Sequence, residues 1–199
     1  FKRRSALNDL ASTDAIFAMV ENKIPVALLS GSGEPYAKIV APDSLGHAEL
    51  RRNQILALDL PLGVEIARAI LRAKLRNQAA NLRYFAKSRA QTAPQIHMRM
   101  RHRADTIDAI ASGLNDIQGN ALDEVRTLFV SHEAQAAHHY WDSLKLILPT
   151  EIGFNARIRH GATDPFNVTL NYGYGILYNK VWTTLMNVGL DPYASLIHT

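Results

Sequence analysis

The sequence contains no cysteine among its 199 residues, which excludes both disulfide bonds and thiolate metal sites. It also lacks a long apolar run, because the longest one, IPVALL, is far too short to span a bilayer. Since 47% of the residues are hydrophobic, the chain can bury a core in one domain, or in one domain and part of another. We therefore expect a soluble, cytoplasmic protein with no membrane partner.

Strand-like patterns are confined to the beginning of the chain. After a loosely helical stretch at 5–23, apolar stretches at 24–29 and 36–40 flank the turn sequence SGSG and predict a pair of strands. Two short strands do not form a stable sheet alone. Because the chain opens on Phe1 and not on methionine, we expect that it begins partway into a longer protein and keeps only the end of a β domain.

From about residue 47 onward the pattern is helical. Proline and glycine separate the periodic segments, and Asp164 with Pro165 forms a typical N-cap and first-turn pair. The predicted fold class is therefore α+β, with residues 1–45 as the C-terminal part of an N-terminal β domain and 46–199 as an all-α catalytic domain. The predicted helices cover about 47–58, 61–87, 104–118, 121–148 and 165–188.

Acidic residues are missing from one long segment. Between Arg68 and Arg103 the sequence has eight arginines and two lysines but no Asp or Glu, which gives +10 in a chain of net charge +4. On the predicted helix 61–87, several of these cations share one face, separate from the apolar one. The cations of this basic stripe are Arg68, Arg72, Arg76, Arg83 and Lys87.

The basic stripe has two interpretations. Exposed helix faces are often rich in Lys and Arg and only keep a protein in solution, but such faces usually mix charge signs. Regularly spaced arginines suit a phosphate backbone, because each contact neutralises one charge and releases counterions. We favour nucleic acid as the partner, and the unbroken helix gives no support to sequence-specific readout.

The stretch SHEAQAAHHYW at 131–141 invites a zinc-protease interpretation, which fails because the position of the second histidine is Ala136. At about 100° per residue Glu133 lies at the edge of an apolar arc, where a carboxylate loses hydration unless a cation compensates. From spacing alone, a salt bridge to Arg126 or to an arginine of a neighbouring helix is the first interpretation, and a metal or catalytic role is the second. By the same reasoning, His198 after an apolar run is most simply a packed core residue.

Several stretches, in a fixed order, carry a resemblance to one family. They are RRNQILALDLPLGVEIARAILRAKLRNQAANL, EAQAAHHYW, FNARIRHGATDPFN with the following NYGYGILYN, and GLDPYASLIH. The last three resemble the signatures E-G-x-A-A-x-x-Y-W/F, F-x-x-R-x-R-x-P-x-x-D-P-x-N and G-L-D-P-x-x-G-F-L-H of the CRISPR-associated adaptation integrases, the first of the Cas proteins. The first includes the family's K-x-x-N-Q at Lys74 to Gln78. The chain departs from the signatures at Ala134, His160-Gly161 and Ser195.

The resemblance implies an architecture and a metal site. The family joins an N-terminal β domain to an all-helical catalytic domain, forms a homodimer, and is bridged to a second dimer by another small CRISPR adaptation protein. In the family a glutamate, a histidine and an acidic residue bind Mn²⁺ or Mg²⁺. Glu133 and His198 match the first two ligands. The third belongs to a family segment about a dozen residues after the histidine, beyond these 199 residues.

The implied chemistry is phosphoryl transfer on double-stranded DNA. The 3′-hydroxyl of a short captured duplex attacks a phosphodiester at the edge of a repeat, as in spacer acquisition for antiviral defence, and a metal activates the hydroxyl and neutralises developing charge. The basic stripe, with Arg157 and Arg159, would position the backbone. Two alternatives remain open: a transposon-encoded, casposase-like integrase, and a non-catalytic helical DNA-binding module.

Overall fold

The computed structural model of the chain describes residues 12–22, 24, 26–29, 35–39 and 48–198. These residues are mostly helical, as the sequence pattern predicts. The chain divides into two compact units, residues 1–51 with 172–192 and residues 52–171 with 193–199. Within the described residues, none of the helices has both the length and the apolar character that crossing a membrane requires.

The first unit contains a short helix and a β-hairpin. Helix α1 (Thr13–Glu21) starts at Ser12, whose hydroxyl accepts a hydrogen bond from the backbone N–H of Ala15 at 3.2 Å, as N-cap serines do. Strands β1 (Val26–Leu29) and β2 (Pro35–Ile39) pair antiparallel, with Val26 opposite Ile39. Both predicted strands are therefore present with slightly shifted bounds, while the SGSG turn at 30–33 lies outside the described residues.

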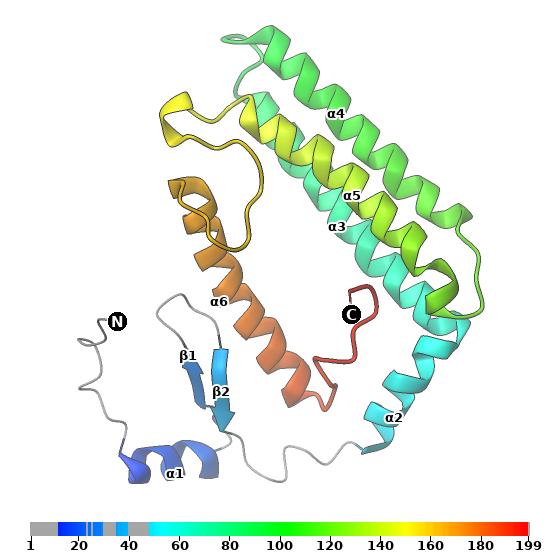
Figure 1. Cartoon of the computed structure of the whole chain (residues 1–199), viewed down its shortest axis with the longest axis vertical. Helices are drawn as coiled ribbons and strands as arrows, with labels where there is room; N and C mark the ends of the chain where they lie inside the picture. The colour runs from blue at the N-terminus through cyan, green and yellow to red at the C-terminus, as the bar shows by residue number, and fades with distance from the viewer. Residues whose placement is uncertain (1–11, 23, 25, 30–34, 40–47, 199) are drawn as a thin grey trace. The chain divides into compact units, whose positions relative to one another are not determined.

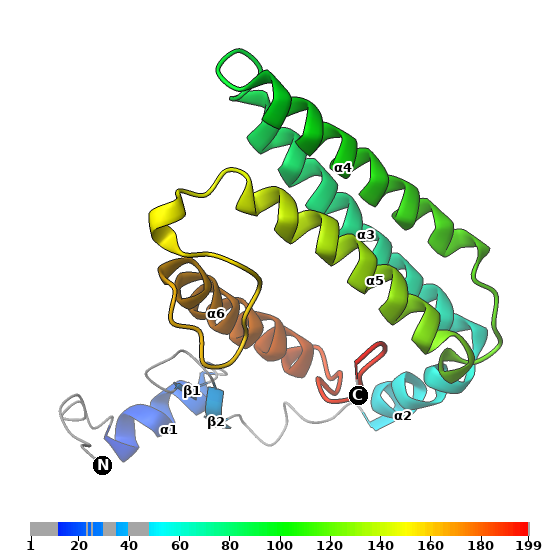
Figure 2. The same ribbon diagram turned by 45° about the horizontal axis from the view of Figure 1, so that its top comes forward.

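Three long helices form the core of the second unit. Helices α3 (Pro61–Lys87), α4 (Pro94–Gly113) and α5 (Leu122–Lys145) lie side by side in both ribbon views (Figure 1, Figure 2). Their facing sides bury one hydrophobic cluster. Its fully buried large side chains include Val64, Leu71, Leu75, Leu82, Met100, Ile107, Leu114, Leu122, Val125 and Phe129.

Shorter elements connect these helices. They are α2 (Ala48–Leu56) and the 3₁₀ turn η2 (Ala57–Asp59) before α3, η3 (Leu114–Asp116) after α4, and η4 (Thr150–Ile152) after α5. The last helix, α6 (Pro165–Asn187), starts in the second unit. Apart from a few residues at their ends, α3, α5 and α6 have the predicted bounds.

The helix predicted at 104–118 begins ten residues earlier, because α4 starts at Pro94. The sequence obscures this start. The first buried side chains of α4 are Met100 and, one turn later, the small Ala104. Between and beside them stand charged and polar residues, so the apolar period that predicts a helix becomes clear only at Ile107.

The junction before α3 depends on two residues. Pro61 occupies the first helical turn, where the absence of an N–H leaves no helical hydrogen bond unmade. A Cβ at Gly63 would lie 2.1 Å from the carbonyl oxygen of Ala57, so only glycine allows η2 to pass this close to α3. The helix break predicted from Asp59, Pro61 and Gly63 is confirmed.

Candidate functional site

Glu133 occupies a core position of α5. The buried residues of this helix include Val125, Phe129, Glu133 and Ala136, which is the spacing of one helix face. Only 9% of Glu133 is exposed. An ionised carboxylate at such a position loses hydration and requires a cation or hydrogen-bond donors. The partners of its two oxygens therefore decide what this side chain can do.

Two side chains from distant parts of the sequence meet the Glu133 carboxylate. Nε2 of His198 lies 2.9 Å from Oε2, and Nζ of Lys74, on α3, forms a hydrogen-bonded ion pair with Oε1. Arg126, the partner that spacing favoured, pairs instead with Asp123 at 2.6 Å. The cation that burial demands is present, but it is a lysine of α3 and not an arginine.

Opposing effects act on the pKa of Glu133. Burial favours the neutral carboxyl and alone would raise the pKa, whereas the Lys74 ammonium and the His198 imidazole favour the anion. These two neighbours outweigh burial, so the pKa of Glu133 lies below its usual value. The carboxylate is ionised at neutral pH, with one oxygen on Lys74 and the other facing His198.

His198 reaches this carboxylate from a segment without helix or strand, residues 193–198. Its own side chain is 62% exposed, so it is not the packed core histidine that its spacing favoured. The preceding Leu196 and Ile197 are the residues that pack against the hydrophobic core. Two hydrogen bonds from Arg126 also hold their carbonyls, at 3.2 and 3.3 Å. The segment is anchored just before the histidine, which projects toward Glu133.

Glu133 and His198 fit two ligands of a divalent cation. Two ligands at right angles on an ion with bonds of about 2.1 Å stand about 3 Å apart. The observed separation of Oε2 and Nε2 is 2.9 Å. A carboxylate oxygen with an imidazole nitrogen suits Mn²⁺, and the carboxylate also suits Mg²⁺. No set of three or more Asp, Glu, His or Cys side chains suited to a metal occurs in the part of the chain that the structure describes.

Two arginines of the basic stripe make contacts within the protein, which the sequence pattern does not indicate. The side chain of Arg68 is only 11% exposed, and it donates to the carbonyls of Leu114 and Ile117 at 3.0 and 2.6 Å. Arg83 pairs with Asp105 and Asp108 of α4 at 2.6 and 2.7 Å. Both arginines fasten α3 to α4 or to the segment that follows it.

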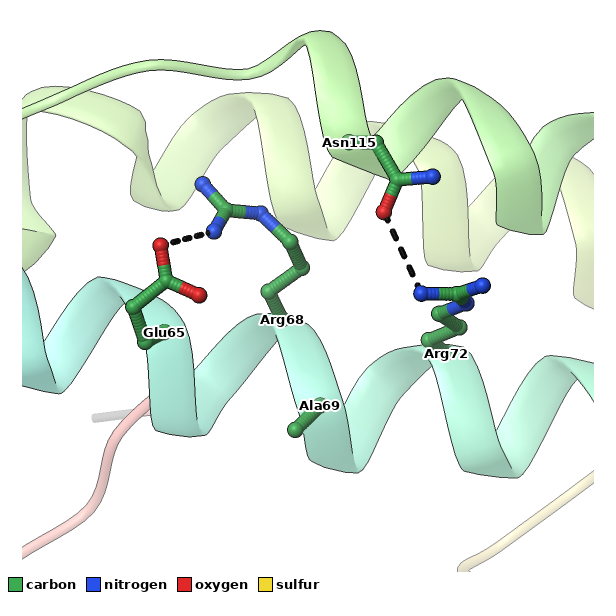
Figure 3. A pocket seen from close by; sticks show the side chains of 5 residues that line it. All are labelled: Glu65, Arg68, Ala69, Arg72 and Asn115. Atoms are coloured by element: carbon green, nitrogen blue, oxygen red, sulfur yellow. Dashed lines mark hydrogen bonds and ion pairs between the residues drawn. The ribbon is translucent and has the colours of Figure 1, made fainter.

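The other stripe residues face outward to different degrees. Figure 3 shows a pocket beside α3, with Arg68 turned to Glu65 and Arg72 turned to Asn115. The Arg72–Asn115 contact is long, at 3.4 Å. Arg76 and Lys87 are exposed, and neither makes a hydrogen bond or ion pair within the described residues. The freest cations of the stripe are therefore Arg76 and Lys87.

Arg157 and Arg159 lie on the loop between η4 and α6, which Asn167 organises. Asn167 is fully buried on the first turn of α6. Its Oδ1 accepts from the backbone N–H of Ile158 at 3.0 Å and from Arg157 Nη1 at 3.2 Å, and its Nδ2 donates to Ala156 O at 2.8 Å. The Arg157 guanidinium stands 6.0 Å from the Trp141 ring centre. The Arg159 side chain is exposed.

Asp164 completes this arrangement. Its Oδ1 accepts from the backbone N–H of Asn167 at 2.9 Å and its Oδ2 from Asn167 Nδ2 at 2.8 Å, which confirms the predicted N-cap. Hydrogen bonds from the Asn167 backbone and side chain hold the pKa of Asp164 below its usual value. Asn167 and its cap Asp164 thus hold residues 156–158 of the loop against the first turn of α6.

The family of the chain follows from comparison with known proteins. Residues 8–199 match the family model described as "CRISPR associated protein Cas1". The chain belongs to the Cas1 family. The resemblance drawn from the ordered motifs is therefore confirmed, and Glu133 and His198, which two of those motifs contain, meet at 2.9 Å.

Two curated relatives of this Cas1-family chain carry the name CRISPR-associated endonuclease Cas1. The one from Archaeoglobus fulgidus is 35% identical over 193 residues, which cover 94% of this chain and 56% of the relative. The one from Korarchaeum cryptofilum is 27% identical over 192 residues, with the same coverage of 94% and 56%. The chain therefore spans little more than half the length of these relatives.

Solved structures share the fold of this Cas1-family chain. A chain of a Cas6-RT-Cas1–Cas2 complex superimposes with a TM-score of 0.69 at 20% identity, over 94% of this chain and 19% of that chain. A casposase bound to an integration product gives a TM-score of 0.61 at 22% identity, over 94% of this chain and 52% of that chain. At these identities the likeness concerns the fold alone.

Lys74 is a site residue that sequence reasoning missed. At about 100° per residue it lies about 240° around α3 from Arg68, at the edge of the buried arc and away from the basic stripe. Two signals could have found it: it is a lone cation at that edge of α3, and it is the first residue of the family's K-x-x-N-Q. Its target could not be derived, because periodicity gives the face of a helix but not the residue that it meets.

Proposed function

We propose that the chain is part of a metal-dependent DNA integrase and endonuclease. It would insert short DNA fragments into a CRISPR repeat array by attack of a 3′-hydroxyl on a phosphodiester, and hydrolytic nicking is the same reaction with water as the nucleophile. One observation carries the proposal: Glu133 and His198, 65 positions apart in the sequence, meet at 2.9 Å in a chain of the Cas1 family. The two curated relatives are named endonucleases, which supports the proposal.

The residues would divide the work as follows. Glu133 and His198 would hold Mn²⁺ or Mg²⁺ together with ligands from elsewhere, and the cation would supply charge neutralisation at the phosphate and activation of the attacking hydroxyl. Lys74 favours the anionic form of Glu133 and contacts Oε1, which leaves Oε2 directed at His198. His198 must present an unprotonated Nε2 to a cation, so its hydrogen bond to Glu133 and metal ligation exclude each other.

Further proposals concern the architecture and the partners. Residues 1–45 would be the C-terminal part of an N-terminal β domain, and 46–199 the helical catalytic domain. The hairpin β1–β2 and the helical second unit support this division. We also propose a homodimer that binds a second small CRISPR adaptation protein. The second partner is supported by the solved Cas6-RT-Cas1–Cas2 complexes, which contain a chain with the fold of this protein.

The proposed DNA surface combines the basic stripe with the loop arginines. Arg76, Lys87 and Arg159 are exposed cations that can follow a phosphate backbone. Arg68, Arg72, Arg83 and Arg157 make contacts within the protein, so their contribution would be to the local positive potential. This assignment favours contact with the sugar–phosphate backbone over base readout.

Strand transfer by the full-length protein tests the function. A labelled short duplex with free 3′-hydroxyl ends is incubated with a plasmid that carries a repeat array, together with the second adaptation protein and Mn²⁺. We expect covalent joining of label to plasmid, complete loss of joining with excess EDTA, and recovery when Mn²⁺ is added back. Joining that persists in EDTA would contradict the metal-dependent mechanism, and no joining in Mn²⁺ or Mg²⁺ would favour the non-catalytic DNA-binding alternative.

A second candidate function, a casposase-like integrase that mobilises its own element, draws on the shared fold with a casposase. The same assay separates the two by sequencing the junctions. Joining at the repeat boundary supports the CRISPR function. Joining that requires terminal inverted repeats on the donor duplex, without regard to the repeat array, supports the transposon function.

Salt dependence tests the proposed DNA surface. Because each phosphate contact releases counterions, the double variant Arg76→Gln/Lys87→Gln should weaken duplex binding and reduce the slope of log K against log salt by about 1 to 2. Binding is measured by fluorescence anisotropy between low and physiological salt. The control Lys145→Gln/Lys180→Gln removes the same charge from exposed lysines outside the stripe and should leave the slope unchanged. If both double variants lose the same duplex affinity and slope, the effect comes from net charge and not from the basic stripe.

A further inference from the structure

The position of His198 requires an explanation. The segment 193–198 has no helix or strand, and the imidazole is 62% exposed. The imidazole contacts Oε2 of Glu133 at 2.9 Å. A single exposed contact does not fix a side chain at the end of an irregular segment, because the loss of backbone and rotamer freedom opposes it. Residues before His198 must therefore set its position.

Arg126 makes two polar contacts with the end of this segment. Nη1 donates to the carbonyl oxygens of Leu196 at 3.2 Å and of Ile197 at 3.3 Å, the two residues that precede His198. On its other edge, Nε and Nη2 donate to Oδ1 of Asp123 at 3.1 and 2.6 Å. The Arg126 side chain is only 21% exposed. One planar guanidinium thus spans α5 and the segment.

The geometry connects this contact with the candidate site. Arg126 and Glu133 are seven residues apart on α5, which is about two helical turns and brings them to the same face. Asp123, one turn before Arg126, accepts hydrogen bonds from the opposite edge of the guanidinium and favours this orientation. The rigid helix therefore carries both the residue that anchors the segment and the carboxylate that the histidine reaches.

We propose that Arg126 is a positioning residue that holds His198 at ligand distance from Glu133. The metal-binding purpose of this arrangement rests on the proposed function. The positioning itself depends only on the contacts of Arg126 with residues 196 and 197. When Arg126 is lost, the carbonyl groups of Leu196 and Ile197 lose this donor, and the packing of these two side chains against the core holds the end of the segment less tightly. His198 then spends less time beside Glu133, and a cation shared by the two residues binds more weakly.

The experiment uses the full-length protein and two readouts that do not depend on integration. The first is the affinity for Mn²⁺, measured by electron paramagnetic resonance of the free ion. We expect Arg126→Gln to weaken it about tenfold or more, as the loss of residues that orient ligands does. The second is thiol labelling of a Ser195→Cys reporter, measured on its own peptide by mass spectrometry. No cysteine competes within these 199 residues. We expect Arg126→Gln to label several-fold faster than the parent.

Two variants separate positioning from general destabilisation. Arg103→Gln removes another partly buried arginine, which pairs with Asp142 at 3.2 Å and lies outside the contacts of segment 193–198. It should change neither readout. Arg126→Lys keeps the positive charge and one donor nitrogen but lacks the planar fork, so it should restore part of both readouts. It also provides the comparison if Arg126→Gln does not fold.

The outcomes distinguish this proposal from the proposed function. If Arg126→Gln changes neither labelling nor Mn²⁺ affinity, or if Arg103→Gln changes both equally, the positioning role is wrong even when the parent protein integrates DNA. If Arg126→Gln changes both readouts while the parent shows no strand transfer, the positioning role stands and the integrase assignment fails.

Discussion

Glu133→Gln should lower strand transfer by about three orders of magnitude or more while duplex binding stays close to that of the parent protein. Glutamine has nearly the same shape and can still contact Lys74, but it removes the negative charge that a divalent cation requires as a ligand. The measurement is the rate of label joining in Mn²⁺ with the full-length protein, next to duplex affinity by fluorescence anisotropy.

A loss of stability is the competing explanation, and magnitudes separate the two. Breaking a buried ion pair costs about 3–5 kcal/mol when the remaining charge cannot be hydrated. The Lys74 side chain is 47% exposed and can turn to water, so the cost should be well below that range. If Glu133→Gln keeps the melting curve and the DNA affinity of the parent, its loss of strand transfer comes from the missing carboxylate and not from unfolding.

Lys74→Gln is the matched control for this substitution. It breaks the same ion pair but leaves the Glu133 carboxylate in place, so metal binding should persist and strand transfer should fall much less than in Glu133→Gln. If both variants lose activity equally, the ion pair and not the carboxylate is what the reaction needs. If Glu133→Gln transfers strands at the parent rate, the assignment of Glu133 is refuted.

The sequence predicts the environment of Glu133 better than its partners. Helical periodicity places Glu133 at the edge of an apolar arc and requires a positive partner, and both are correct. The identity of that partner depends on how α3 and α5 are aligned along their axes, which no single-helix pattern contains. His198 is harder still to predict as a partner, since only the family signatures distinguish it from an ordinary packed histidine.

For the basic stripe, the sequence overestimates how many cations are free to bind a partner. Its residues do share one face of α3, but the absence of acids in the sequence between 68 and 103 does not mean that acids are absent in space. Asp105 and Asp108 come from α4, beyond the end of that segment, and neutralise Arg83. Arg68 serves backbone carbonyls instead of phosphates. Charge counts along a sequence overestimate the free positive surface wherever a neighbouring helix carries the counter-charge.

Asn167→Ala should lower stability by about 2–4 kcal/mol, because several partly buried groups lose their partner together, and each costs up to about 1–3 kcal/mol if it stays unsatisfied. The lost contacts are those to Ile158 N, Arg157 Nη1, Ala156 O and the Asp164 carboxylate, with lengths of 2.8–3.2 Å. The full cost appears in a denaturation curve only if the loop remains folded, since local opening limits the loss. Hydrogen exchange of the Ile158 amide measures that opening directly.

Asn171→Ala is the matched control for the same loop. Asn171 also donates to loop carbonyls, at 3.3 Å to Ile158 O and at 2.9 Å to Arg159 O, but these bonds are exposed to solvent, and water can replace them. It should cost no more than about 1 kcal/mol and leave the Ile158 amide protected. Equal effects of the two variants would mean that burial of Asn167 is not what fixes the loop. If only Asn167→Ala opens it, Arg157 and Arg159 depend on this one buried amide for their placement in the proposed DNA surface.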